Sequence, residues 1–195
     1  MPEVELPNTE ELGEMREKTF TKRVALTTAI FAVLLAFTSL GGSHATKEML
    51  LAQQQAADQW AFYQSKAVRE HLYRLQKMRL ETDLLERGST MRPDVRKEYE
   101  SKLKNMGDEE ARYGAERKKI EREATALEHE RDVHRRKDPY FEYGEVLLQI
   151  AIVMASISIL SLSRPVFYVA LLAAFGGTLA MLNGYLLIVR LPFFP

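Results

Sequence analysis

The sequence predicts an all-α protein with three transmembrane helices and a long antiparallel, coiled-coil-like helical hairpin between the first and the second. The first observation is the distribution of charge, because residues 46–142 contain 21 of the 27 Lys and Arg residues and 20 of the 27 Asp and Glu residues. The second is that three long apolar runs flank this charged stretch, one before it and two after it. Runs of this length and composition are typical of helices that cross a bilayer.

The expected segments follow one another along the chain. Residues 1–23 form a polar, amphipathic segment whose acidic residues precede its basic residues, as suits a helix dipole. The first transmembrane helix is expected at residues 24–45, the hairpin at 46–142, and the other two transmembrane helices at 143–163 and 165–190. Ser43 and Ala45 also fit a signal-peptide cleavage site, but the apolar run before them is long for such a peptide, so an uncleaved helix is expected.

The hairpin is predicted from helix formers and turn residues. Residues 46–87 lack proline and glycine, whereas Gly88 and Pro93 favour a turn and a new helix start. We expect a kink or short break at Gly107, which is followed by an aspartate. Apolar residues recur at helical spacings in the first half, and a heptad series marks the second. They are Ala57, Ala61, Val68, Leu72, Leu75, Met78 and Leu85, and then Tyr99, Met106, Tyr113, Ile120, Leu127 and His134.

Two groups of residues are candidates for an interface with another chain. The first surrounds the only tryptophan, because large aromatic side chains commonly anchor protein interfaces. The second lies in the third apolar run, where small residues spaced by four allow helix backbones to approach closely. The candidates are Trp60, Phe62, Tyr63 and Gln64 in the hairpin, and Gly176, Ala180, Asn183 and Gly184 in the third transmembrane helix.

The composition argues against several classes of function. The formal net charge is zero and the two signs are interleaved, which disfavours nucleic-acid binding. The chain has no cysteine, and His129 and His134 are five residues apart rather than at the four-residue spacing of a chelating pair. No glycine-rich phosphate loop is recognisable. We therefore expect no enzyme activity, no metal and no cofactor.

Three segments carry a resemblance to a known family. They are DQWAFYQSK, RYGAERKKIEREATALEHERD and FEYGEVLLQIAIVMASISILS, and the similarity extends over roughly residues 24–187. The chain resembles an uncharacterised bacterial family of small three-span membrane proteins with a helical insert, which is described only as a domain of unknown function. The resemblance implies the same architecture, and it transfers no catalytic residue and no ligand.

The expected function is that of a membrane-anchored structural or scaffolding protein, which self-associates through its spans and its hairpin. The alternative is a channel or transporter subunit, in which rings of Ser156, Ser158 and Asn183 line a pore and the hairpin forms a vestibule or gate. The expected partners are the bilayer, a second copy of the chain and a protein bound by the hairpin. The resemblance implies a bacterial protein, which we expect in the inner membrane. Four bases precede the first apolar run, so we expect a cytoplasmic N-terminus and a periplasmic hairpin.

Overall fold

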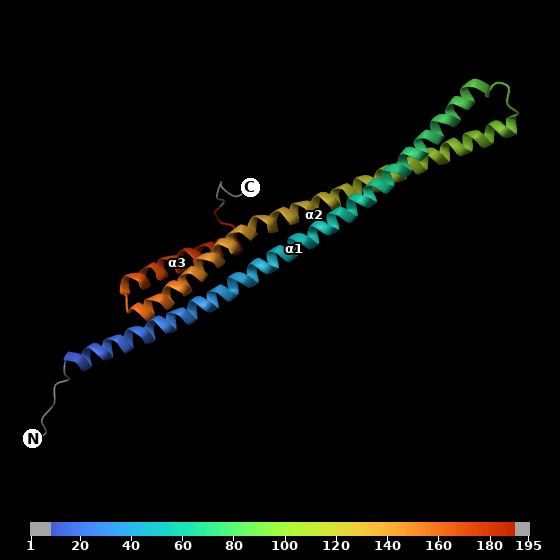
Figure 1. Ribbon diagram of the computed structural model, residues 1–195. Helices are drawn as coiled ribbons and strands as arrows, with labels where there is room; N and C mark the ends of the chain where they lie inside the picture. The colour runs from blue at the N-terminus through green and yellow to red at the C-terminus, as the bar shows by residue number, and fades with distance from the viewer. Residues whose placement is uncertain (1–8, 190–195) are drawn as a thin grey trace, which may run out of the picture. The chain divides into compact units, whose positions relative to one another are not determined.

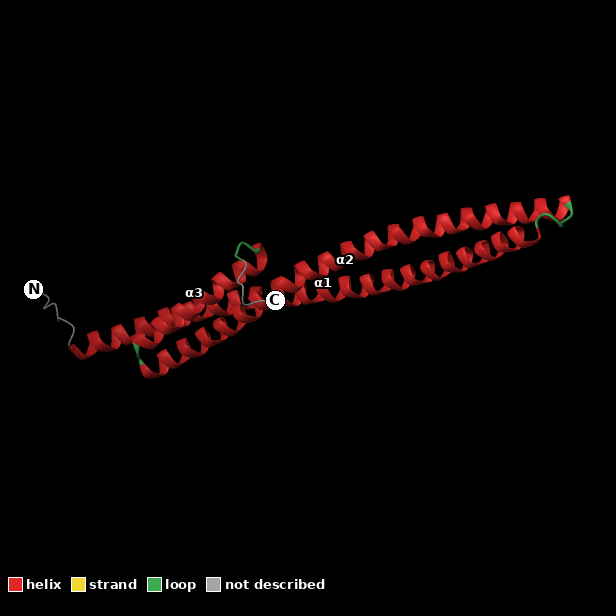
Figure 2. Ribbon diagram, turned by 90° about the horizontal axis from the view of Figure 1, so that it is seen from above, coloured by secondary structure: helices red, strands yellow, loops and turns green. Residues whose placement is uncertain are grey.

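The computed structural model describes residues 9–189, with side chains from residue 13 onward. Within this range the chain forms three helices, α1 (Thr9–Arg87), α2 (Pro93–Ser161) and α3 (Arg164–Leu186) (Figure 1). The described residues contain no strand (Figure 2), so the all-α prediction is confirmed. Each helix contains a stretch long and apolar enough to cross a membrane.

Helices α1 and α2 run through internal glycines. Helix α1 continues through Gly41 and Gly42, and α2 passes Gly107 without the break that the sequence suggested. That expectation was wrong because a glycine inside a helix costs only about 1 kcal/mol relative to alanine. Neighbouring helix formers offset this cost at Gly107, where an added Cβ atom would meet nothing within 4 Å. At Gly41 the missing side chain makes room for Phe141, since a Cβ atom would lie 2.5 Å from its ring.

The two connections between helices are short and capped. Gly88 donates its backbone N–H to the Leu84 carbonyl at 2.9 Å, and Pro93 then begins α2. Ser163 precedes α3 in an extended conformation, and Pro165 occupies the first turn, where its missing N–H is harmless. The predicted turn at this proline is therefore present. Helix α3 ends three residues before Val189, with Leu187 in the left-handed region at φ 50°.

The chain forms two compact units. The three-helix unit comprises Met1–Met49 and Val133–Pro195, and the two-helix unit comprises Leu50–Asp132. The interior of the three-helix unit is built largely of small residues, whereas many large apolar side chains point outward, such as Leu160 (86% exposed) and Leu172 (72% exposed). Its main buried cluster is Val24, Phe31, Leu148, Ala151, Ala155, Ala170 and Ala174.

The two-helix unit pairs the second half of α1 with the first half of α2. Side-chain contacts join residues whose numbers rise along α1 while they fall along α2. The pairs are Trp60 with Glu128, Lys66 with Glu116, Tyr73 with Tyr113, and Arg74 with Glu110. Apart from Gly88, the buried residues of this unit are Ala52, Ala56, Glu70, Tyr113 and Ala124. The seam, where α1 and α2 meet, therefore buries no leucine, isoleucine, valine or methionine fully.

Candidate interaction site

A buried carboxylate lies in the middle of the two-helix unit. Glu70 is only 5% exposed, and its Oε1 atom accepts a hydrogen bond from Arg74 Nη2 at 2.9 Å. Its Oε2 atom lies 3.2 Å from Arg117 Nε, close enough for an ion pair although not aligned as a hydrogen bond. A Cβ atom on Gly114 would lie 3.6 Å from the Glu70 carboxyl carbon. The buried Glu70 carboxylate therefore lies within ion-pair distance of two arginines, one from each helix.

Two further carboxylates on α2 accept hydrogen bonds from basic residues on α1. Glu110 accepts from Arg74 Nε at 2.7 Å and from Lys77 Nζ at 3.4 Å, and these interactions lower its pKa, the Arg74 hydrogen bond most strongly. Glu116 accepts from Lys66, and this hydrogen bond is the main cause of its lowered pKa. The charged form of both groups is thus favoured by the folded seam.

The lowered pKa values predict that acid weakens the two-helix unit. A carboxyl group whose pKa is depressed by folding stabilises the protein above its unfolded pKa, and this contribution is lost as pH falls through the folded pKa. We expect the protection of amide hydrogens in residues 66–77 and 110–116, relative to their exchange in an unfolded chain at the same pH, to fall as the pH falls below about 4, the ordinary carboxyl range. Glu110→Gln should reduce the pH dependence of this protection. An unchanged profile in that variant would contradict the assignment.

Aromatic rings fill the space beside these charges. Tyr113 is buried and stacks on Tyr73, with ring centroids 5.5 Å apart. The guanidinium carbon of Arg112 lies 4.8 Å from the Tyr113 ring centroid, in cation–π contact. Hydrogen bonds from Arg69 and then from Arg112 lower the pKa of the Tyr113 hydroxyl. The seam is therefore held by cations around a tyrosine, in place of a continuous row of leucines.

The structure separates the four hairpin candidates into two pairs. Trp60 donates its indole N–H to Glu128 at 3.0 Å and packs edge-on against Tyr63, with centroids 5.2 Å apart. Tyr63 in turn lies under Arg117, whose guanidinium carbon is 5.4 Å from the ring centroid. Trp60 and Tyr63 thus contact α2 of their own chain, whereas Phe62 and Gln64 are exposed. An intermolecular role for these residues stays a prediction.

A continuous exposed row of residues runs along the side of α1 that faces away from α2. Its positions alternate at spacings of four and three, the pattern of a coiled-coil seam. We call it the outer stripe, and it consists of Ala57, Ala61, Gln64, Val68, His71, Leu75, Met78, Thr82 and Leu85, all of them exposed. The apolar spacing is visible in the sequence, but which side of α1 meets α2 becomes clear only from the contacts of Glu70, Tyr73 and Lys77.

The candidates in the third transmembrane helix also divide. The face of α3 that packs inside the three-helix unit contains Ala170, Ala174, Gly177, Met181 and Gly184. Gly184 belongs to it, since a Cβ atom there would lie 3.0 Å from the Phe141 ring. Gly176 and Ala180 are only partly buried. They remain available for the intermolecular contact predicted from the sequence.

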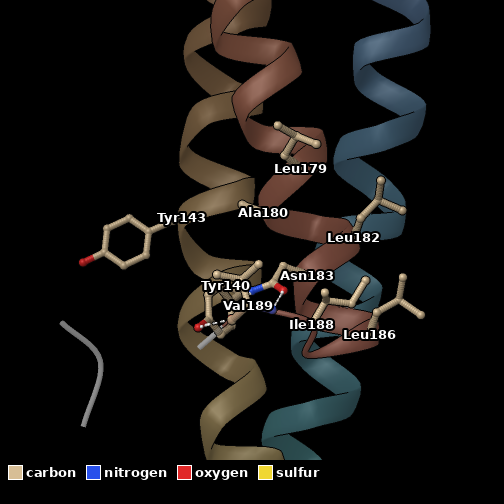
Figure 3. A pocket seen from close by; sticks show the side chains of 9 residues that line it. All are labelled: Tyr140, Tyr143, Leu179, Ala180, Leu182, Asn183, Leu186, Ile188 and Val189. Carbon is tan, nitrogen blue, oxygen red and sulfur yellow. Dashed lines mark hydrogen bonds between the residues drawn. The ribbon is translucent and has the colours of Figure 1, made fainter. Parts of the chain in front are cut away.

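Asn183 fixes the segment that follows α3 through hydrogen bonds to Val189 (Figure 3). Its Nδ2 donates to the Val189 carbonyl at 2.9 Å, and its Oδ1 accepts from the Val189 N–H at 2.9 Å. The Tyr140 hydroxyl donates to the same carbonyl at 3.0 Å. Both polar backbone groups of Val189 are therefore satisfied in apolar surroundings, where leaving them unpaired would be costly.

A hollow of about 570 Å³ lies beside this amide and is lined almost entirely by apolar side chains. Among the residues that the structure describes, no group of three or more His, Asp or Glu side chains could hold a metal ion. The hollow is lined by Tyr140, Tyr143, Leu179, Ala180, Leu182, Asn183, Leu186, Ile188 and Val189.

Comparison with known proteins identifies the family of the chain. A family model described as a domain of unknown function, DUF4337, matches residues 20–187. No similar curated protein and no similar solved structure was found. The match covers most of the sequence, from the last part of the N-terminal polar segment to the end of α3. The chain therefore belongs to the DUF4337 family, whose function is unknown.

Proposed function

We propose that this protein is a membrane-anchored scaffold, inserted by three transmembrane helices and self-associating through its antiparallel helical hairpin. The observation that carries the proposal is that the three-helix unit buries small side chains and exposes large apolar ones, the reverse of a water-soluble protein. Small residues such as Ala151, Ala155 and Ala174 are buried, while Leu26, Leu160 and Leu172 are exposed. Water-soluble proteins rarely expose apolar surface on this scale.

A bilayer accounts for this distribution. Lipid tails solvate exposed leucine and phenylalanine, while small residues let helix backbones pack closely. Gly144 and Gly177 illustrate the second effect, because a Cβ atom on Gly177 would lie 2.9 Å from the Gly144 carbonyl oxygen. Such contacts stabilise helix pairs where the surrounding lipid is as apolar as the side chains.

The polar groups of the apolar segments do not favour the channel alternative. The Ser156 hydroxyl donates to the Ile152 carbonyl, and the Ser158 hydroxyl donates to the Ser163 carbonyl. Asn183 is bonded to Val189 through both its nitrogen and its oxygen. These three groups satisfy local backbone atoms of their own chain, so they offer no row of free donors to a pore.

The proposal is tested by fractionation and native mass measurement of the full chain. We expect the protein to stay with membranes after carbonate and urea washes, to require detergent for extraction, and to exceed the monomer mass in a mild detergent. Release by the washes would contradict membrane anchoring. A monomer at all concentrations would contradict self-association.

The proposed location is a bacterial inner membrane, with the hairpin in the periplasm. Arg16, Lys18, Lys22 and Arg23 precede the first apolar run and support a cytoplasmic N-terminus. Protease added outside spheroplasts is expected to cut the exposed turn near Ser89 and Thr90. Cleavage only in inside-out vesicles would reverse the orientation.

A further inference from the structure

The outer stripe of α1 has the spacing and exposure of a coiled-coil seam, and it has no partner within the two-helix unit. We propose that it packs against a hollow on a second copy inserted in the same membrane, so that α1 of each chain lies along α2 of the other. This proposal rests on the self-association proposed above and specifies its contact surface.

The continuity of α1 restricts how two copies can meet. Helix α1 extends without a break from Thr9 to Arg87, so it contains both the first apolar run and the outer stripe. Two copies inserted in one membrane therefore present their α1 helices in the same direction. Because α2 runs antiparallel to α1 in the two-helix unit, the stripe of one copy meets α2 of the other as an antiparallel helix pair.

The stripe supplies the large apolar side chains of this contact. Leu75, Met78 and Leu85 are 62%, 55% and 87% exposed. Over residues 93–132, all of which the structure describes, α2 exposes no large apolar side chain. Burial of the stripe would be favourable, and α2 offers small side chains against which it can be buried.

The hollow that receives the stripe lies between α1 and α2 and has a volume of about 590 Å³. Its α2 side is built largely of small residues, namely Gly107, Ala111, Gly114 and Ala115. A Cβ atom added at Gly107 would meet nothing within 4 Å, so this side of the hollow is open. The carboxylates that line the hollow, Glu70 and Glu110, are already paired with arginines of their own chain.

The stripe and the hollow lie on the same side of the two-helix unit. Arg74 lines the hollow from α1. The stripe residues His71 and Met78 are three and four residues from Arg74, so they are its neighbours on the helix surface. One face of the unit therefore contains both halves of the contact, and a twofold axis parallel to the helices brings each half against the other.

The large residues of the stripe lie level with the small residues of the hollow. Tyr73 stacks on Tyr113 within one chain, so these two residues mark one level of the unit. The same twofold axis keeps every level unchanged, so residues level in one chain also face each other between two copies. Counting from the tyrosine pair gives two facing pairs, the second to within one residue: Leu75 with Ala111 and Met78 with Gly107.

Charges at the edge of this contact are complementary. Arg79 would lie beside Asp108 of the second copy, and Asp83 beside Lys104 of the second copy, each to within one residue of the same level. Among the described residues, none of these four side chains forms an ion pair within its own chain. Since each pairing occurs twice, four opposite-charge pairs would join the two copies.

Pairing of the two stripes with each other in one membrane is disfavoured by charge. In such a parallel pair the flanking residues would be Arg74 with Arg79 and Glu81 with Glu86, both of like charge. The contact between α1 and α2 avoids both of these pairings.

Cross-linking tests the contact directly because the chain has no cysteine of its own. Full-length Met78→Cys and Gly107→Cys chains, with tags of different size, are produced together so that both insert in one membrane, and the membranes are oxidised. We expect the mixed dimer to exceed each self-dimer at least about fivefold, because a disulfide requires Cα atoms within about 7 Å.

The matched control replaces Gly107→Cys by Asn105→Cys. Asn105 is exposed and lies two residues before Gly107, about 200° around the helix and thus on the opposite face. It should not link to Met78→Cys. Equal linking of the two α2 variants would show that no defined face is used and would refute the proposal.

The other outcomes separate this proposal from the broader one. Predominant self-linking of Met78→Cys would establish a contact between the two α1 helices and overturn the proposal. An oligomer by native mass that lacks the mixed cross-link would exclude this contact, while self-association would stand. A monomer by native mass would overturn both.

Charge exchange provides an independent test. Arg79→Glu and Asp108→Arg each place like charges together at two positions, so each should raise the dimer dissociation constant in a mild detergent by about three- to tenfold. Both changes in one chain restore opposite charges, and the dissociation constant should return to within about twofold of the original. A combined variant that associates no better than the weaker single variant would contradict this register.

Discussion

Replacing Gly177 by alanine is expected to destabilise the three-helix unit, whereas the same replacement at the adjacent Gly176 is not. A Cβ atom on Gly177 would lie 2.9 Å from the Gly144 carbonyl oxygen and 2.9 Å from Leu148 Cγ, so α2 and α3 would have to separate. Overpacking of this kind typically costs about 1–3 kcal/mol. At Gly176 the nearest atom is Leu147 Cδ1 at 3.5 Å, an ordinary contact.

Because the two glycines are adjacent in one helix, the comparison separates packing from helix propensity. Both replacements gain the same helix propensity, about 1 kcal/mol, so the difference between them reports packing alone. Thermal unfolding of the full chain in one detergent, with hydrogen exchange over residues 144–181, would measure it. Equal stability of the Gly176→Ala and Gly177→Ala proteins would show that the close contact between α2 and α3 is absent in solution.

Glu70→Gln is expected to loosen the two-helix unit around its middle. The amide retains the size of the carboxylate but leaves Arg117, whose side chain is 26% exposed, without its negative partner, while Arg74 keeps Glu110. Removing one partner of a largely buried ion pair is costly because the remaining charge stays poorly solvated. Amide protection from hydrogen exchange near residues 70 and 117 should fall about tenfold or more.

The control for Glu70→Gln is a surface ion pair of the same unit. Glu98 lies 2.8 Å from Lys102, and both side chains are more than half exposed. Exposed pairs of this type contribute little to stability, so Glu98→Gln should leave protection nearly unchanged. Comparable losses in both variants would mean that burial of Glu70 does not matter. Restoration of protection by Arg117→Gln in the Glu70→Gln background would support the charge imbalance as the cause.

The helical architecture could be predicted because its signals are local. The apolar runs, the turn before Pro93 and the proline after Arg164 each act within a few residues of sequence, and the structure contains all three features. The packing at Gly41, inside the helix expected over residues 24–45, could not be predicted in the same way. It depends on Phe141, one hundred residues later, which occupies the space where a side chain would stand.

The contacts of the candidate residues could not be predicted from the sequence for a related reason. The sequence shows small residues on two neighbouring faces of α3, but only the positions of Gly144 and Leu148 decide that Gly177 faces inward. Trp60 presents the same problem, since its partner Glu128 is 68 residues away. Periodicity identifies the faces of a helix, whereas the choice between them depends on residues distant in sequence.

The hydrogen bonds of Asn183 also affect the rate at which this residue deamidates. Gly184 follows this asparagine, and in flexible chains such a pair deamidates readily, because the glycine backbone nitrogen attacks the side-chain amide. Here the helical backbone and the two bonds to Val189 hold the amide away from that nitrogen. Deamidation at this position would therefore require local opening of the end of α3. The rate at which the protein gains mass by deamidation of Asn183 would therefore report how often the end of α3 opens.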